Sequence, residues 1–290
     1  MGYDFDWVVA FSDRPFGGNG CVVVHDCQEL SLETRLNIVR ETSLVECTFV
    51  EPSDVADFRF RIYLASREIP FAGHPTLAGV ASLRHRGLVS GSAITIETQA
   101  GIIPIELGDD GQIAMTQVAP VFGPEVPKDL VAAAVSLNAD DIIAEPQVTS
   151  TGLPFTITVV RDKETLERAR VNPAALQVLQ ASIDFPDTDV MEPFLVTLQG
   201  ATDLGDTYSR LLLAPPMPPE DPFTGSATGA MASYLWEKGL IAQPDFVAEQ
   251  GHGMGRPGQA QVSVKGAPGA IKGVRLSGMS HVTMSGILNI

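Results

Sequence analysis

Basic residues are scarce in this sequence. Its 290 residues include 19 Lys and Arg against 35 Asp and Glu, which gives a formal net charge of −16. Because a surface of this charge repels phosphate backbones and anionic lipid headgroups, we expect neither nucleic acid nor a membrane as a partner. A small-molecule partner is the better expectation.

Long apolar runs are also missing. No stretch approaches the roughly 18 residues that a membrane-spanning helix requires. The residues Met1–Asp6 include two aspartates, where a secretory signal would be basic. The sequence therefore predicts a cytoplasmic protein.

Cysteine and metal-binding motifs are few. The three cysteines, Cys21, Cys27 and Cys47, are an odd number in a long chain, which indicates reduced thiols that pack in the interior rather than a disulfide framework. The five histidines form no HExxH motif, and no paired CxxC is present, so we expect no metal. The glycines at 251–255 lack the strand-to-helix spacing of a dinucleotide fingerprint, so we expect no nucleotide cofactor.

The composition is that of a folded chain. With 44% hydrophobic residues, it has enough apolar material for two ordinary domains. Residues 119–127 contain three prolines and one glycine, which interrupt helices and central strands. We therefore predict an N-terminal domain at 1–117 and a C-terminal domain at 118–278, and we allow a last strand at about 279–290 to return to the first domain.

A nine-residue turn occurs twice. Glu68–Thr76 and Glu220–Thr228 are identical at five of nine positions, and each continues into a segment of small and apolar residues. These segments, 77–83 and 229–235, have apolar residues nearly all round a helix, which is typical of a buried helix. The repeat predicts a pair of related domains, each with a buried central helix wrapped by sheet.

The repeated turns are candidate binding sites. Gly73 and Gly225 permit a ligand to approach the backbone closely, and the N–H groups at a helix start attract an anion such as a carboxylate. Two such helix starts facing one cleft would hold a small anionic substrate. The alternative is that both are only helix caps after a Pro turn.

The two copies differ in their polar side chains. His74 aligns with Ser226, and Asp221 aligns with Ile69. An imidazole and a carboxylate in opposed turns could orient a polar substrate or act as general acid and base. The alternatives are a structural histidine and an aspartate that interacts only with the helix dipole.

Glu46 interrupts an otherwise apolar stretch, residues 44–50, at the start of a predicted strand. Desolvation raises the pKa of a glutamate among apolar neighbours, and a proton shuttle near neutral pH needs that property. The alternative is an acid at a strand edge that points to water.

Five segments together resemble a known family. They are residues 11–19, 43–50, 70–76, 220–227 and 249–257. The sequence is similar to the PhzF-like phenazine-biosynthesis isomerases, which have the diaminopimelate-epimerase-like fold, and the similarity runs almost end to end. The resemblance implies an α+β fold of two similar domains, each with a mixed sheet curled into a barrel around a central helix, and a cleft between them. It also implies a homodimer and a cofactor-free isomerase in which a glutamate moves a proton between carbons.

Carried over to this sequence, the resemblance makes Glu46 the catalytic glutamate and His74 and Asp221 its polar partners. Gly73, Gly225 and Ser226 then line the turns that hold an anion. Departures from the family pattern lie at Gly20, Val45, Cys47 and Phe223. Since several flank the site residues, the family's dihydro-hydroxyanthranilate substrate is not carried over.

The leading hypothesis is a cofactor-independent isomerase that shifts an allylic proton on a small carboxylate. Two alternatives stay open: an amino-acid-type epimerase or racemase, and a non-catalytic ligand-binding protein on the same scaffold. Related racemases use one cysteine at each helix start, and neither turn here contains one, which disfavours a two-thiol mechanism.

Overall fold

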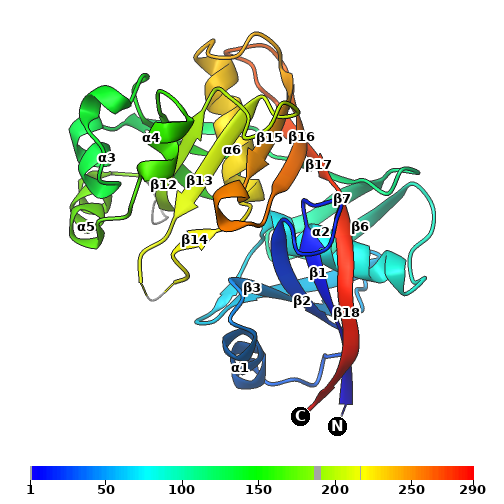
Figure 1. Ribbon diagram of the computed structural model, residues 1–290. Coiled ribbons are helices and arrows are strands. Elements are labelled where there is room, and N and C mark those ends of the chain that lie inside the picture. The colour runs from blue at the N-terminus through cyan, green and yellow to red at the C-terminus, as the bar shows by residue number, and fades with distance from the viewer. Residues whose placement is uncertain (1, 186–190, 216) are drawn as a thin grey trace. The chain divides into compact units, whose positions relative to one another are not determined.

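A computed structural model describes residues 2–185, 191–215 and 217–290 (Figure 1). The chain forms two compact units. Unit 1 contains the residues up to 116 together with 277–290, and unit 2 contains residues 117–276. Across the described ranges, no helix is both long and apolar enough to cross a membrane.

Unit 1 has a mixed sheet and two helices. Its strands are β1 (Gly2–Ala10), β2 (Asn19–Val24), β3 (Glu46–Glu51), β4 (Phe58–Leu64), β5 (Glu68–Ile69), β6 (Ala93–Thr98), β7 (Gly101–Leu107), β8 (Ile113–Gln117) and β18 (Ser280–Asn289), and its helices are α1 (Leu32–Thr42) and α2 (Gly73–His85). The strands pair in the order β18–β1–β2–β3–β4–β6–β7–β8, with β5 also on β4. The pairs β2–β3 and β4–β6 are parallel, and the others are antiparallel.

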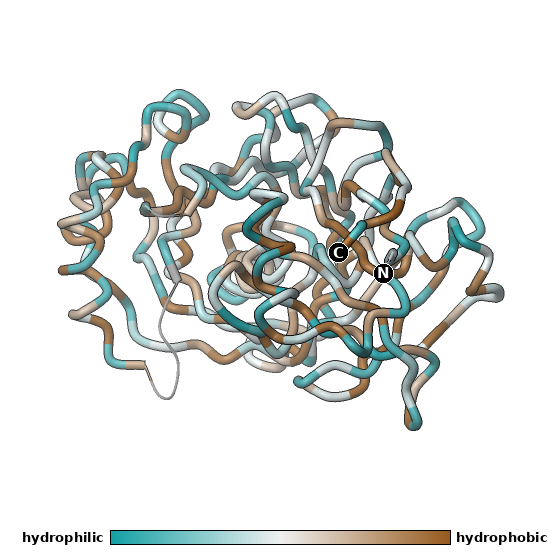
Figure 2. Tube along the Cα trace, turned by 90° about the horizontal axis from the view of Figure 1, so that it is seen from below, coloured by the Kyte–Doolittle hydropathy of each residue, from teal (hydrophilic) through white to brown (hydrophobic). Residues whose placement is uncertain are grey.

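The two ends of the chain lie side by side in unit 1 (Figures 1 and 2), because β1 and β18 pair from Gly2–Asn289 to Ala10–Ser280. The strand predicted at about 279–290 therefore joins the N-terminal residues. A buried carboxylate connects this pair to α2. Asp6 of β1 accepts hydrogen bonds from Ser82 (2.5 Å), Ser285 (2.6 Å) and Arg86 (2.6 Å).

Helix α2 is the central helix of unit 1. Every residue from Gly73 to Leu83 is buried, and the helix contacts β1, β2, β3, β4 and β18. Gly79 sets how closely it packs, because a Cβ there would lie 2.5 Å from the Phe60 ring of β4. The expectation of a buried central helix is confirmed.

Unit 2 has nine strands and four α-helices among its described residues. The strands are β9 (Val121–Glu125), β10 (Gln147–Ser150), β11 (Pro154–Val159), β12 (Met191–Thr197), β13 (Thr207–Leu212), β14 (Glu220–Asp221), β15 (Asp245–Gln250), β16 (Gly258–Lys265) and β17 (Gly273–Gly278). The helices are α3 (Lys128–Ala134), α4 (Lys163–Arg168), α5 (Pro173–Ser182) and α6 (Gly225–Glu237), with short 3-10 turns η1 (Ala139–Asp141) and η2 (His252–Met254).

The strand pairing of unit 2 repeats that of unit 1. The order is β9–β10–β11–β12–β13–β15–β16, with β14 also on β13, and the parallel pairs are β11–β12 and β13–β15. Strand β9 thus corresponds to β18, β10 to β1, and α6 to α2. The nine-residue repeat belongs to a duplication of the whole α+β fold.

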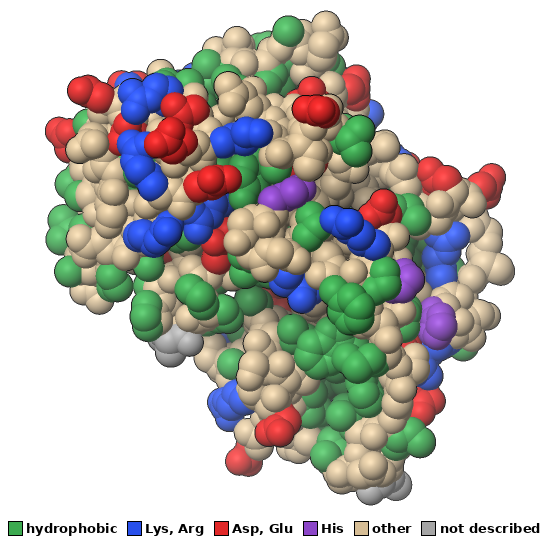
Figure 3. Space-filling view, viewed as in Figure 1, with side chains coloured by type: hydrophobic (Ala, Val, Ile, Leu, Met, Phe, Trp, Pro, Cys, Tyr) green, Lys and Arg blue, Asp and Glu red, His purple; other side chains and the backbone are tan. Residues whose placement is uncertain are grey.

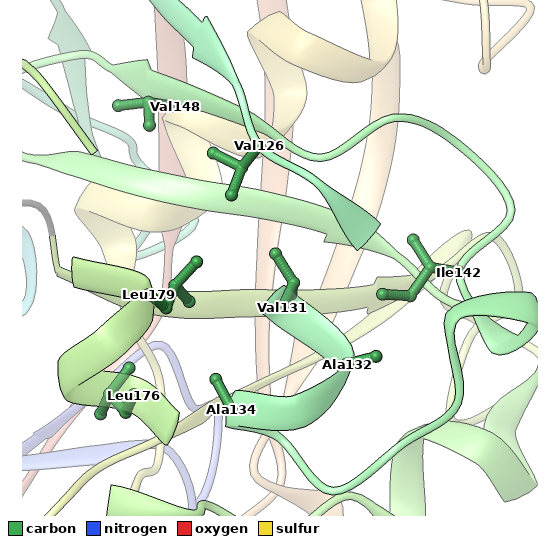
Figure 4. Packing of buried hydrophobic residues seen from close by; sticks show 8 residues of the cluster. All are labelled: Val126, Val131, Ala132, Ala134, Ile142, Val148, Leu176 and Leu179. Carbon is green, nitrogen blue, oxygen red and sulfur yellow. The ribbon is translucent and has the colours of Figure 1, made fainter. Parts of the chain in front are cut away.

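One face of the unit 2 sheet is covered by helices. Val131 of α3 and Leu176 and Leu179 of α5 form a buried cluster with Val126 and with Val148 of β10 (Figure 4). Helix α3 lies in the connection between β9 and β10, so it covers the sheet beside its edge strand.

Candidate active site

The first site residues are a carboxylate and an imidazole in unit 1. Glu46 is the first residue of β3, and His74 is the second residue of α2. Oε2 of Glu46 lies 3.2 Å from Nδ1 of His74, and the two side chains are only 12% and 5% exposed. Glu46 is therefore largely shielded from water. This differs from the alternative, in which Glu46 was an acid at a strand edge that points to water.

The environment of His74 keeps its ring neutral. Burial lowers the pKa of His74 to about 3, and a hydrogen bond with the backbone of Gly20 opposes this shift only in part. Asn19 of β2 places Nδ2 3.2 Å from the same Nδ1 atom. Nε2 is buried, and no group in the described part of the chain hydrogen-bonds to it. One ring nitrogen thus contacts polar groups of the protein, and the other has no hydrogen-bond partner among the described residues.

Cys47 follows Glu46 but does not share its surroundings. Its thiol lies 3.6 Å from the Thr42 hydroxyl, and burial raises its pKa to about 11. Successive side chains of a strand point to opposite faces, so the thiol lies on the other side of β3 from the Glu46 carboxylate. Cys47 is a packing residue.

The repeated turn of unit 2 is held by a residue that the sequence patterns missed. Gln250, the last residue of β15, is fully buried. Its Nε2 donates to the Asp221 carbonyl (2.8 Å) and to Thr224 Oγ1 (3.2 Å), and its Oε1 accepts from the Thr224 amide (3.0 Å). The Thr224 hydroxyl donates to the Asp221 carboxylate at 2.5 Å. Gln250 therefore sets the position of Asp221; its only sequence signal is that it falls within segment 249–257.

Two further polar residues hold the first turn of α6. Gln117 donates to the Gly225 carbonyl (2.9 Å), and Thr151 donates to Gln117 Oε1 (2.6 Å) and to the Ser226 carbonyl (3.3 Å). A Cβ at Gly229 would lie 1.8 Å from Gln117 Oε1, so any larger residue there would displace the Gln117 amide. These bonds hold the carbonyl groups of Gly225 and Ser226 and so fix the start of α6.

The glutamate shared by the two repeats is structural. In unit 1, Arg61 Nε and Nη2 donate to both oxygens of Glu68 (2.9 and 2.6 Å). In unit 2, Arg210 Nε and Nη2 donate to both oxygens of Glu220 (3.0 and 2.7 Å). Each two-bond pair joins the beginning of the repeated turn to the preceding long strand.

The starts of both central helices lack a side-chain cap. Helices α1, α4 and α5 are preceded by the N-caps Ser31, Asp162 and Asn172, whose side chains accept from a backbone amide. At the N-caps of α2 and α6, Ala72 and Thr224, no side chain accepts such a bond, and the same is true of Pro127 before the short helix α3. No side-chain cap therefore uses the first backbone amides of these two helices. A helix start that binds an anion requires amides without a cap.

The predicted residues fall into two sets. Unit 1 brings together Glu46, Gly73 and His74, and it adds Asn19. Unit 2 brings together three predicted residues, Asp221, Gly225 and Ser226, and adds Gln250, Gln117 and Thr151. The cleft expected between the two domains stays a prediction. In the described ranges, no group of three or more His, Cys, Asp or Glu could hold a metal ion.

Comparison with known proteins identifies the family. Residues 8–286 match the family model of the phenazine biosynthesis-like proteins, PhzC-PhzF. The chain is 30% identical over 282 residues to the trans-2,3-dihydro-3-hydroxyanthranilate isomerase of Pseudomonas aeruginosa, with 93% of each chain covered. It is 28% identical to an uncharacterized isomerase of Bacillus subtilis, with 97% of each covered.

A solved structure shows the same fold. The crystal structure of a PhzF-family phenazine biosynthesis protein from Bacillus anthracis matches with a TM-score of 0.87 and 26% identity, over 100% of both chains. The matching family model and the shared fold confirm the resemblance seen in the sequence. The relatives of this chain include named isomerases. This chain belongs to the PhzC-PhzF family of phenazine biosynthesis-like proteins and is an isomerase.

Proposed function

We propose that the protein moves a proton between two carbon atoms of a small carboxylate, with Glu46 as the proton shuttle. The observation that carries this proposal is the Glu46–His74 pair, in which a largely buried carboxylate lies 3.2 Å from an imidazole. In the reaction, Glu46 takes a proton from one carbon, the electron pair shifts along an adjacent double bond, and the proton returns at another carbon. No atom or electron is gained or lost.

The neutral state of His74 suits this role. A protonated imidazole at 3.2 Å would hold Glu46 as a permanently ionised partner and weaken it as a base. With a pKa of about 3, His74 is uncharged near neutral pH, so Glu46 can both accept and release a proton. Nε2 of His74 then forms a hydrogen bond with a polar group of the substrate.

The uncapped helix starts would bind the substrate's negative charge. We propose that the substrate carboxylate binds to the backbone amides near Gly73–His74 and Gly225–Ser226, in a cleft between the domains. This local attraction counters the −16 net charge, which slows the approach of an anion. Asp221, held by Gln250, would orient a polar group of the substrate.

The test is proton exchange in heavy water, followed by NMR. The first compound is trans-2,3-dihydro-3-hydroxyanthranilate, because a relative of 30% identity is named for it, and a panel of unsaturated and amino carboxylates follows. We expect the protein to exchange a C–H proton of at least one compound, and Glu46→Gln to lose that activity. Exchange at an equal rate in Glu46→Gln would contradict the shuttle.

The optical rotation of the product distinguishes the remaining alternatives. A shifted double bond without inversion identifies a tautomerising isomerase, and inversion at one carbon identifies an epimerase. Binding that shifts the melting temperature, without exchange for any compound, would identify a ligand-binding protein on this scaffold.

A further inference from the structure

The loop that leads into the unit 1 site is longer than its counterpart in unit 2. Ala10 of β1 pairs with Asn19 of β2, so residues 11–18 form a loop of eight residues between these strands. The corresponding hairpin of unit 2, between β10 and β11, is closed by three residues, 151–153. The fold therefore needs no loop as long as 11–18 at this point. Loops beyond what a scaffold requires are common positions for residues that contact ligands.

Contacts within the protein hold this loop in one shape. The Ser12 amide donates to the Met279 carbonyl (3.0 Å), and the Ser12 hydroxyl donates to the Arg14 carbonyl (3.0 Å). Gly18 has a φ of +50°, and a Cβ there would lie 2.0 Å from the carbonyl oxygen of Ala10. The two ends of the loop therefore meet closely, and the residues between them have a defined position.

Two phenylalanines of the loop have a left-handed backbone. Phe11 has a φ of +61° and Phe16 a φ of +67°, a region that bulky residues rarely adopt. Phe11 is fully buried, so its side chain anchors the loop in the protein interior. Phe16 is 76% exposed, so burial of its ring does not offset the unfavourable conformation. A strained backbone that core packing does not explain is a marker of a functional position.

Exposure alone would not single out Phe16, because hydrophobic side chains reach the surface at several places (Figure 3). Leu204, between β12 and β13, is 75% exposed, but its backbone lies outside the left-handed region. Phe16 also differs in position, since it lies three residues before Asn19, whose Nδ2 is 3.2 Å from Nδ1 of His74. Three residues span at most about 11 Å. Phe16 is therefore close to any ligand that binds to His74.

We propose that Phe16 is a specificity-determining residue, whose ring contacts the carbon skeleton of a substrate bound at His74. The inference rests on the proposed function, in which a small unsaturated carboxylate binds at the start of α2. Glu46, His74 and Asn19 supply polar contacts there, and the ring of Phe16 adds an apolar face on which a flat carbon skeleton stacks. A cyclic unsaturated carboxylate is thus bound better than a short-chain one, which does not extend from His74 to Phe16.

Steady-state kinetics of Phe16→Gly tests this contact. Glycine adopts a left-handed backbone readily, so the variant keeps the shape of the loop and loses only the ring. For trans-2,3-dihydro-3-hydroxyanthranilate, or for the cyclic compound of the panel that the wild type exchanges fastest, we expect KM to rise at least about tenfold with little change in kcat. Short-chain compounds should show a smaller rise, and Phe16→Tyr should restore most of the loss. Leu204→Gly is the matched control and should behave like the wild type.

Tryptophan fluorescence gives a measurement that does not depend on turnover. Adding the same cyclic compound should change the emission of Phe16→Trp more than that of the wild type, and Leu204→Trp should respond like the wild type. An unchanged KM in a folded Phe16→Gly would overturn the inference. Equal losses for cyclic and short-chain compounds, or a fall in kcat at constant KM, would overturn it as well. A wild type that exchanges no compound would instead contradict the proposed function, and this inference with it.

Discussion

Oε2 of Glu46 lies 3.2 Å from Nδ1 of His74, although the two residues belong to different elements, the start of β3 and the start of α2. Burial keeps the histidine neutral, with a pKa of about 3. The pair is thus a carboxylate with a neutral hydrogen-bonding partner, and it differs from an ordinary surface ion pair in both burial and charge.

Glu46→Gln should lower turnover by about 10²–10⁴-fold while leaving the fold intact, because it keeps the side-chain shape and removes the base. The measurement is the rate of deuterium incorporation into the active compound, together with the melting temperature. Glu41→Gln, an exposed glutamate of α1, is the matched control and should react at the wild-type rate. A Glu46→Gln rate within a factor of a few of the wild type would refute the assignment.

His74 should stay neutral in the folded protein down to about pH 4. Its pKa is lowered from 6.5 to about 3, so between these values the unfolded chain binds a proton that the folded protein does not. His74 therefore lowers the free energy of unfolding by roughly 1.4 kcal/mol for each pH unit below 6.5. Urea unfolding of wild type and His74→Asn from pH 7 to 4.5 measures this.

The two proteins should diverge in that series, with the shallower loss of stability in His74→Asn. Histidine NMR gives an independent reading, since the ring signals of His74 should not titrate near pH 6.5. Parallel stability curves, or a His74 signal that titrates near 6.5, would show that the ring is protonated in the folded state.

Asp6 should stabilise unit 1 in a pH-dependent way. Burial alone would raise the pKa of Asp6, but the hydrogen bonds from Arg86, Ser285 and Ser82 lower it to about 2. This stabilisation is present above the ordinary value of 3.8 and is lost as the pH falls toward 2. Asp6→Asn should cost roughly 2–4 kcal/mol at pH 7, because Arg86 loses its buried ionised partner and keeps only the exposed Asp4.

The matched control for Asp6 is Asp4→Asn. The Asp4 side chain is 55% exposed and contacts the same Arg86 at 3.1 Å, so its loss should cost less than about 1 kcal/mol. Chemical denaturation at pH 7 compares the two variants. Equal losses would mean that burial of Asp6 contributes nothing beyond a surface ion pair.

Gln250→Glu should disturb the turn that carries Asp221. The new carboxylate still accepts from the Thr224 amide, but it cannot donate to the Asp221 carbonyl, which loses a buried bond worth about 1–3 kcal/mol. We expect lower stability and weaker binding of the active compound, measured by urea unfolding and by calorimetric titration. Gln261→Glu, at an exposed position of β16, should change neither. Unchanged affinity in a folded Gln250→Glu would mean that the turn needs no such support.

The sequence by itself determined the features that depend on local pattern. Small and apolar residues nearly all round 77–83 and 229–235 predict buried helices, and α2 and α6 are buried at these positions. The Pro-rich segment predicts a domain junction at 117/118, which stays a prediction. Such features are readable because periodicity and Pro chemistry act between neighbouring residues.

The tertiary structure decided which polar groups form hydrogen bonds with each of the two repeated turns. Asn19 reaches His74 across 55 positions and Gln117 reaches Gly225 across 108, so no local pattern marks either contact. The glutamate identical in both repeats also shows this limit, because its partner arginine lies 7 positions away in unit 1 and 10 in unit 2. The repeat shows that this glutamate is identical in both copies, but it assigns the side chain no role. Only the pairing of β4 with β5, and of β13 with β14, showed that it holds a turn in place, because the two side chains meet across paired strands.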